Sequence, residues 1–413
     1  MVRIIAVACC LVLLGAPARP FAQAPVSTLT LDEALSLAGA ANPTVRAKEF
    51  EVQAVGANEV TAALRPNPSA NFLAEQFGGA SSASQIQYTF NVGQPIELGG
   101  KRQRRIESAK AATKVTGLEL ADLKRQLVFQ VKKSFSDILV AREALALTEQ
   151  NLAALGELER VQRFRAEKGD ISGLELLRIE VERFAFERDA ADARQALGAA
   201  KVALRTAVGQ ERVAEQFEVV GELTFPVVAR SRSELYRMAL DARPDLRAAQ
   251  AAREKARADI DLARANAWGD ITPQIEYQRI GPDNTIGFGF SLPIKLFDRN
   301  QGEIARTQAE AKRAEATREA LLAQALAEVD LALAAVTAER AKVALLRDTY
   351  LPKMKQARDT VEFAYQRGGV TLLDFLDAQR TYREKSLDYF RSLGNYHTAL
   401  YQLEAAVGGP LEK

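Results

Sequence analysis

The sequence contains few of the side chains that bind transition metals or act as nucleophiles. Its 413 residues include two cysteines, one histidine and three methionines. Cys9 and Cys10 both lie in the apolar run near the start, so a chain without that run has no thiol chemistry. Cysteine, histidine and methionine are preferred ligands of zinc and copper. The sequence therefore predicts no resident metal and no cofactor, and an enzyme is the least favoured class. His397 is expected to be a packing or surface residue.

The sequence also has no marked excess of positive over negative charge. The formal net charge is +2, and basic and acidic residues alternate along the chain. A nucleic-acid partner requires a concentrated basic face, so we predict none. The abundance of alanine, leucine, glutamate and arginine favours long helices over a compact α/β enzyme.

The first 24 residues have the composition of a secretory signal. Arg3 precedes an apolar run from Ile4 to Leu14, and small residues follow. A run of about 11 residues is too short for a membrane-spanning helix, which needs about 20. We predict that residues 1–24 are a signal peptide cleaved after Ala18 or Ala24, with a lipid anchor as the weaker alternative. No later stretch is expected to form a transmembrane helix, so strands must make any membrane contact.

The rest of the chain is a tandem repeat. Three segments recur in the same order about 200 residues later, which is the sign of a duplication. They begin at Ala41, Ile86 and Lys168, and recur at Ala242, Ile286 and Arg367. We predict a first repeat at 25–215, a connector at 216–232 and a second repeat at 233–409.

Each repeat is expected to be mostly helical. The predicted helices are Leu31–Leu64, Lys101–Lys168 and Gly173–Val208, followed by Ser233–Ala267, Arg299–Arg367 and Thr371–Val407. The longest would extend for roughly 100 Å, so they must pack lengthwise on neighbours as coiled coils do. Pro352 predicts a bend or a new start in the second long helix.

Two strand pairs interrupt the helices. The predicted strands are Pro68–Phe77, Ser84–Val92, Ile271–Ile280 and Ile286–Leu292, with turns at Gly78 and Gly281. The second strand of each pair places apolar residues on one face, which is typical of outer-membrane barrels. The smallest such barrels have about eight strands, and an open sheet in lipid leaves its edges unsatisfied. Closure therefore requires several copies of the chain.

The segment after the second strand reads QPIELGGKR and resembles a phosphate-binding loop only superficially. Pro95 stands where that loop needs its first glycine, and Arg102 replaces its hydroxyl residue. We predict a strand-to-helix joint in which Pro95 ends the strand's hydrogen bonding and Gly99 and Gly100 turn the chain. The corresponding joint in the second repeat keeps Pro293 and has no glycine.

With these features, the chain resembles the TolC-type outer-membrane efflux proteins, most closely their heavy-metal (CzcC-like) branch. The resemblance rests on the opening LTLDEALSLAGAANPTV, the phrase QPIELGGKRQRR and the two glycine-leucine turns. It implies a mainly α fold with a membrane β-barrel contribution, in which each copy adds four strands to a twelve-stranded barrel of a homotrimer. The helices would form a long periplasmic barrel.

The resemblance also implies a function. The protein would be the outer-membrane channel of a tripartite efflux system in a Gram-negative bacterium, with a large periplasmic part. It would conduct substrates, divalent metal cations foremost, from a periplasmic adaptor and an inner-membrane pump of the resistance-nodulation-division type, and would not be an enzyme. The competing hypothesis is a periplasmic coiled-coil adaptor or scaffold without a membrane-spanning part.

The family places two turns, Gly169–Leu177 and Gly368–Leu376, at the periplasmic mouth as adaptor contacts. Asp374 and Asp377 match an aspartate pair that rings the entrance, where mutual repulsion would raise some of their pKa values. Without the resemblance, both aspartates read as solvated helix-surface acids.

Two further residues match the family's gate. Glu175 and Tyr365 correspond to closing contacts between neighbouring helices. The arginine that the family places after the second turn is replaced by Val370. The closed state is therefore expected to be held differently.

Overall fold

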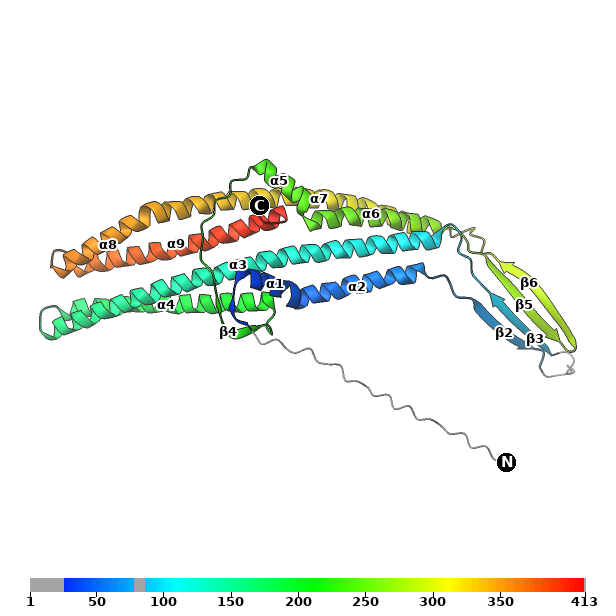
Figure 1. Ribbon diagram of the computed structural model, residues 1–413, viewed down its shortest axis with the longest axis horizontal. Helices are drawn as coiled ribbons and strands as arrows, with labels where there is room; N and C mark the ends of the chain where they lie inside the picture. The colour runs from blue at the N-terminus through cyan, green and yellow to red at the C-terminus, as the bar shows by residue number, and fades with distance from the viewer. Residues whose placement is uncertain (1–25, 78–85, 412–413) are drawn as a thin grey trace, which may run out of the picture.

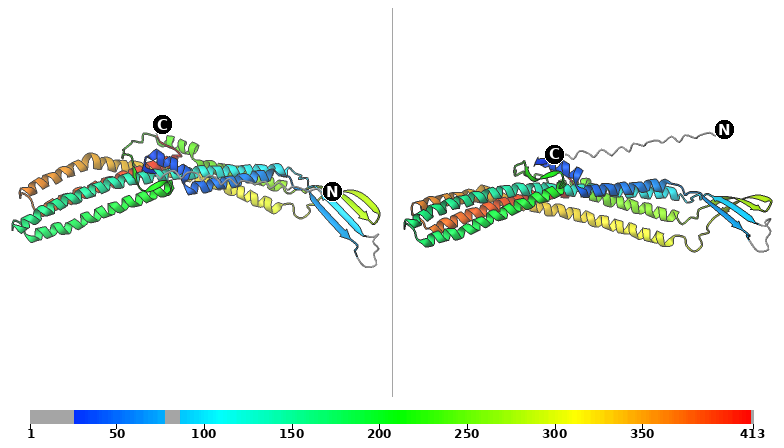
Figure 2. Two further views of the ribbon diagram at one scale, coloured as in Figure 1. Left: turned by 60° about the horizontal axis from the view of Figure 1, so that its bottom comes forward. Right: turned by 90° about the horizontal axis from the view of Figure 1, so that it is seen from below.

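The computed structural model describes residues 26–77 and 86–411. The molecule is strongly elongated, with a β-sheet at one end, helix-connecting turns at the other, and a belt of short elements around the middle (Figure 1). The views in Figure 2 show the same long body from two other sides. The predicted signal, residues 1–24, lies outside the described residues.

The long helices agree with the sequence prediction. The first repeat has α3 (Lys101–Glu167) and α4 (Gly173–Val208). The second has α7 (Gln301–Leu345), a π-helical turn η2 (Leu346–Tyr350), α8 (Leu351–Gln366) and α9 (Leu372–Val407). Near Pro352, where a bend or a restart was predicted, the backbone stays helical but the hydrogen-bond spacing changes: the π-helical turn η2 directly precedes α8, and Pro352 is the second residue of α8.

The shorter helical stretches are each broken in two. The first consists of α1 (Leu31–Ala41) and α2 (Pro43–Ala63), and the second of α5 (Arg232–Ala242) and α6 (Pro244–Ala265). A proline begins the second helix of each pair and holds the preceding residue in an extended conformation. The prediction of one continuous helix in each place was therefore wrong.

The four predicted strands form one antiparallel sheet. Its members are β2 (Ser69–Glu75), β3 (Gln87–Gly93), β5 (Thr272–Ile280) and β6 (Asp283–Ser291), in the order β2-β3-β5-β6. Gly281, with φ of +54°, lies in the β5–β6 turn as predicted. The turn predicted at Gly78 and the start of the strand predicted from Ser84 lie outside the described residues.

The described residues contain two more strands than the four predicted. β1 (Val26–Leu29) and β4 (Val213–Val219) pair in parallel at mid-length, so β4 overlaps the predicted connector. The short β1 and the irregular register of the pair give little alternation that a sequence pattern could reveal.

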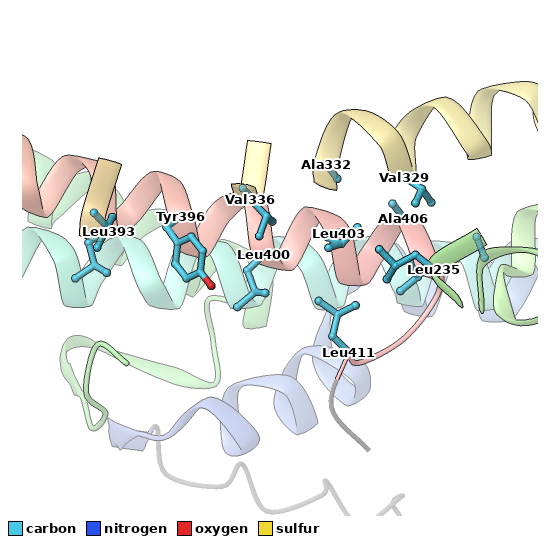
Figure 3. Packing of buried hydrophobic residues seen from close by; sticks show 14 residues of the cluster. Leu235, Val329, Ala332, Val336, Leu393, Tyr396, Leu400, Leu403, Ala406 and Leu411 are labelled. Carbon is cyan, nitrogen blue, oxygen red and sulfur yellow. The ribbon is translucent and has the colours of Figure 1, made fainter. Parts of the chain in front are cut away.

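The hydrophobic core is concentrated around this middle belt. One cluster packs α5, α7 and α9 together around residues such as Leu235, Val336 and Leu403 (Figure 3). The Tyr396 ring is fully buried there, and its hydroxyl donates to the Pro226 carbonyl of the connector. Full burial of one such leucine contributes roughly 2 kcal/mol, so this belt stabilises the long helices at their centre.

One later helical stretch is more apolar than the sequence analysis expected. By length and composition, Gln301–Gln366 is long and apolar enough to cross a membrane. The sequence reading passed over it because its apolar character comes largely from alanine, interrupted by Glu328 and Asp330. In the fold this stretch packs lengthwise against α6 and α9.

Candidate functional site

The four-stranded sheet has one apolar face. Directly opposite residues on antiparallel strands share a face, and two rows of them are almost entirely apolar. The first row is Phe72, Phe90, Tyr277 and Ile286, and the second is Ala70, Val92, Ile275 and Phe288. Phe288 is 81% exposed in the single chain. An exposed apolar surface of this extent marks contact with a membrane or with another protein.

The opposite face of the sheet is mostly polar, with Leu73 as an exception. One row consists of Asn71, Asn91, Glu276 and Gly287. The Asn91 amide donates to the Gln274 side chain at 3.2 Å on this face. Apolar residues on one side and polar residues on the other suit a sheet that separates lipid from water.

The first strand-to-helix joint, joint 1, comprises residues 94–100. Gly99 and Gly100 have φ of +68° and +71°, so both predicted turning positions lie in the left-handed region. A Cβ atom on Gly99 would lie 2.7 Å from the Trp268 ring, so only glycine fits there without displacement. Gly100 is the residue that precedes α3.

The prediction for Pro95 was wrong. Pairing with β5 continues past it, because the Gln94 N–H donates to the Pro273 carbonyl at 3.1 Å and the Ile96 N–H to the Ile271 carbonyl at 2.8 Å. In an antiparallel ladder alternate residues bond to the same neighbour. The missing N–H of Pro95 therefore falls on the side away from β5, and no β5 bond is lost.

The basic residues after joint 1 bind protein groups. The Lys101 ammonium lies 2.6 Å from the Asp270 carboxylate, and Arg105 pairs with Glu97 at 2.5 Å. The guanidinium groups of Arg102 and Arg105 also donate to carbonyl groups at the end of α2. Those carbonyls have no partner within their own helix. The cluster therefore ties α2 and α3 together at the end of the sheet.

The second joint, joint 2, comprises residues 292–300. It turns the chain into the helix with an asparagine in place of glycine. Asn300, with φ of +61°, precedes α7 as Gly100 precedes α3. Asparagine tolerates the left-handed region, and its side chain here donates to the Ala263 carbonyl at 2.7 Å. Pro293 lies two residues after the end of β6, and Phe297 is 91% exposed. Joint 2 is thus far more open than joint 1.

The two predicted tips are tight glycine turns at the far end of the molecule (Figure 1). Gly169 and Gly368 have φ of +83° and +73° and follow the ends of α3 and α8. Leu177 is exposed on α4, and Leu376 is half-buried on α9. Between these two helices lies an open groove of about 450 Å³. It is lined by four leucines and Val181, and equally by four charged residues, Arg178, Glu182, Asp377 and Arg380.

The two predicted ring aspartates have different local roles. Asp374 accepts from the Thr371 N–H and hydroxyl at 3.0 and 2.6 Å, forming a capping box at the start of α9. These hydrogen bonds lower the pKa of Asp374, opposite to the rise expected from repulsion in a ring. Asp377 is exposed and pairs with Arg380 at 2.5 Å. Sequence reasoning missed the capping role, although the Thr-x-x-Asp spacing was visible.

The predicted gate residues lie on facing elements without bonding to each other. Within the described residues, no hydrogen bond joins Glu175 to Tyr365. The Tyr365 ring stacks on Phe375 with 5.1 Å between centroids. Burial raises the pKa of the Tyr365 hydroxyl, and the nearby negative charge of Glu175 raises it further. The pair is close enough for electrostatic coupling, and Val370 contributes no charge.

An unpredicted arginine links the two halves of the tip. Arg383 on α9 is 5% exposed and lies 3.2 Å from the Asp189 carboxylate of α4. Its guanidinium also stacks over the Phe186 ring at 4.3 Å, and Glu182 lies 3.9 Å away. In the sequence it looks like one more charge on a solvated helix face, so no pattern pointed to it.

Comparison with known proteins gives a consistent result. A family described as "Outer membrane efflux protein" matches residues 34–210 and 235–409. The cobalt-zinc-cadmium resistance protein CzcC of Cupriavidus metallidurans is 29% identical over 94% of this chain and 92% of its own length. The Brucella suis outer membrane efflux protein BepC is 25% identical over 73% of this chain and 68% of its own.

Solved structures show the same fold. A crystal structure of the CusC channel aligns with a TM-score of 0.77 over 92% of both chains at 19% identity. The open-state MtrE outer membrane channel of Neisseria gonorrhoeae aligns with a TM-score of 0.75 over 92% of this chain and 89% of its own, at 20% identity. The fold is therefore that of the outer-membrane channels with a long helical body.

The two-faced sheet, the long helices and these matches define the class as an outer-membrane channel. The chain belongs to the outer membrane efflux protein family, as the sequence resemblance predicted. It is an efflux channel of the Gram-negative outer membrane with a large periplasmic part.

Proposed function

We propose that three copies of the chain form one continuous export duct. Three sheets of four strands would close into a twelve-stranded barrel, and the helices would line a periplasmic tunnel. The observation that carries this proposal is a sheet with an apolar face, a polar face and two open edges. In lipid each unpaired backbone group costs several kcal/mol, so such a sheet is stable there only when closed.

The test is fractionation followed by native mass spectrometry. We expect the protein in the outer-membrane fraction, extracted by detergent as a particle of three chains that forms pores in planar bilayers. Recovery as a soluble periplasmic protein would instead support the coiled-coil adaptor or scaffold and reject the duct.

The tips at Gly169, Leu177, Gly368 and Leu376 are proposed as the adaptor contacts. The groove between α4 and α9 offers exposed leucines flanked by charges of both signs, which suits the apolar edge of a helical hairpin. We expect Leu177→Asp to weaken capture of the cognate adaptor at least tenfold while trimers still assemble. Leu331→Asp on α7, at an exposed leucine outside the tip, is the matched control. Equal adaptor binding by both variants would contradict this placement.

Asp374 and Asp377 are proposed as an entrance ring, and Glu175 with Tyr365 as gate contacts. Three copies would bring six carboxylates towards one axis, and a ring of this kind attracts cations. The position of both aspartates in the first two turns of α9, at the tip, and the exposure of Asp377 support the role.

Divalent metal cations are the proposed cargo, delivered by a periplasmic adaptor and an inner-membrane pump of the resistance-nodulation-division type. The support is the likeness to CzcC, whose name records cobalt, zinc and cadmium resistance. No cluster of three potential ligands occurs in residues 26–77 and 86–411. We therefore propose that partners select the ion and that the channel conducts it without catalysing a reaction.

Resistance assays test the cargo. Deleting the gene should lower the tolerated concentrations of cobalt, zinc and cadmium salts, and the wild-type gene should restore them. Loss of resistance to organic toxicants alone would replace metals by that class of substrate.

A further inference from the structure

The seam between β3 and β5 joins the two halves of the chain within one sheet. Gly93 on β3 lies opposite Gln274 on β5, and Val92 lies opposite Ile275. The outer strands, β2 and β6, each have one edge without a partner in the described sheet (Figure 1). The internal seam therefore shows how the last strand of one half, β3, pairs with the first strand of the next half, β5.

The two halves can be aligned through their own hairpins. Gly93 lies two residues before Pro95 and pairs with Ser69, the first residue of β2. Ser291 lies two residues before Pro293 and pairs with Thr272, the first residue of β5. Ser291 is thus the counterpart of Gly93. By the same alignment Asn71, two residues after Ser69, is the counterpart of Gln274.

From this alignment we propose that β6 pairs antiparallel with β2 of a second copy of the chain, with Ser291 opposite Asn71. The inference rests on the proposed trimer and adds its register. It places Phe290 opposite Phe72 on the apolar face, and Gly289 opposite Leu73 on the other face. A slip by one residue would set apolar residues of one copy against polar residues of the next.

The exposure of joint 2 supports the same partner. Ile96 and Leu98 of joint 1 are 48% and 37% exposed because the start of the second half packs beside them, whereas their counterparts Ile294 and Leu296 are 78% and 62% exposed. In the proposed seam, residues 64–68 of the second copy lie where residues 267–271 lie beside joint 1. The apolar side chains of joint 2 are then covered by the neighbouring chain.

The ion pair of joint 1 has no exact equivalent at the proposed seam. At joint 1 the Asp270 carboxylate accepts from the Leu98 N–H at 3.1 Å and pairs with Lys101. The counterpart of Asp270 is Asn67, two residues before β2, and the same alignment makes Arg299 the counterpart of Lys101. The acidic member of the internal pair is thus replaced by a neutral amide at the seam between copies.

Pro68 is the counterpart of Ile271, whose N–H donates to the Ile96 carbonyl at 3.2 Å. A proline cannot make that bond, but Ala70 stands where the internal seam has Pro273, so the proposed seam regains at Ala70 a donor that the internal seam lacks. Proline is tolerated next to the start of an edge strand.

Disulfide cross-linking tests the register. Because Gln94 bonds to Pro273 in the internal seam, the adjacent pair Gly93 and Gln274 is a non-hydrogen-bonded pair, whose side chains are close. Asn71→Cys combined with Ser291→Cys should therefore form disulfides between copies on oxidation with copper phenanthroline in outer membranes. Non-reducing electrophoresis should show covalent trimers. The natural cysteines, Cys9 and Cys10, lie in the predicted signal, and each single variant controls for background.

A shifted pair provides the matched control. Asn71→Cys with Gly289→Cys keeps the same face but places the thiols on a diagonal, where Cα atoms are about 7–8 Å apart and cross-linking should be roughly fivefold lower. Preferential linking of the shifted pair overturns the register, as does a three-chain particle by native mass in which the Asn71–Ser291 pair stays unlinked. A one-chain particle by native mass overturns the proposed trimer together with its register.

Discussion

At the scale of single residues, His397 shows how burial determines an acid-base property. The imidazole lies on α9 beside the Tyr396 and Tyr401 rings, and neither ring nitrogen has a hydrogen-bond partner within the described chain. Burial lowers its pKa below the usual 6.5, and the Thr224 backbone opposes this shift to a smaller extent. The sequence expectation of a packing or surface histidine is resolved in favour of packing.

A pH dependence of stability follows. A lowered folded-state pKa means that the unfolded chain binds the proton more readily, so His397 costs stability as the pH falls below about 6.5 and has no such effect above it. When the pH is lowered from 7.5 to 5.5, the melting temperature of the His397→Phe variant should fall less than that of the wild type, as measured by circular dichroism. An identical fall in melting temperature in the two proteins would show that protonation of His397 does not contribute to the pH dependence of stability.

Arg383 provides a second prediction at this scale. Its removal leaves the half-buried Asp189 carboxylate without its partner from α9. Arg383→Met should therefore destabilise the fold by about 3 kcal/mol, the lower end for a broken buried ion pair. Arg380→Met removes an exposed pair with Asp377 and should cost no more than about 1 kcal/mol. Thermal unfolding in detergent ranks the two, and equal melting temperatures would contradict a linking role for Arg383.

At the scale of elements, the sequence predicted what helix-forming composition encodes. The 67 residues of α3 and the 36 of α4 are rich in alanine, leucine, glutamate and arginine and contain no proline, so the existence of these helices and nearly all of their boundaries could be predicted. The breaks before Pro43 and Pro244 were missed because a proline in the first turn of a helix leaves the surrounding helical pattern intact. The capping bond between Asp374 and Thr371 was also missed, because the sequence analysis assigned Asp374 to the entrance ring and did not consider its local contacts.

The two glycines of joint 1 have separable roles. Gly99→Ala adds a Cβ atom 2.7 Å from Trp268 and 3.1 Å from the Ala265 carbonyl, and it also strains the backbone at positive φ. We expect a loss of about 3 kcal/mol from strain and overpacking together.

Gly100→Ala meets no atom within 4 Å and should lose only the backbone term of about 1 kcal/mol. Gly100→Asn should be nearly neutral, as Asn300 adopts the same conformation at the start of α7. The measurements are outer-membrane yield and melting temperature. A Gly100→Ala variant as defective as Gly99→Ala would show that steric contact with Trp268 is not the decisive factor.

At the scale of the whole molecule, the described sheet has two unpaired edges, but its strands alternate apolar and polar residues regularly. Its strands were predictable because alternating residues separate an apolar from a polar face, and the same alternation fixes which residues of a second copy can lie opposite. The gate could not be derived in this way. Contacts of Glu175 and Tyr365 across copies depend on how three chains are placed around an axis, which no local pattern of one chain contains.

The entrance ring gives the prediction that depends most on assembly. If three copies bring Asp377 and Asp374 to one axis, Asp377→Asn should reduce blockade by a trivalent cation in planar-bilayer conductance about tenfold, because cation affinity depends on converging carboxylates. Asp374→Asn combined with Asp377→Asn should reduce it further, because both carboxylate charges are removed while an amide oxygen at position 374 can still accept from Thr371. Asp348→Asn, on an exposed π-helical turn, is the control and should leave blockade unchanged. Undiminished cation affinity in the double variant would place these aspartates away from the conducting path, however well the trimer forms.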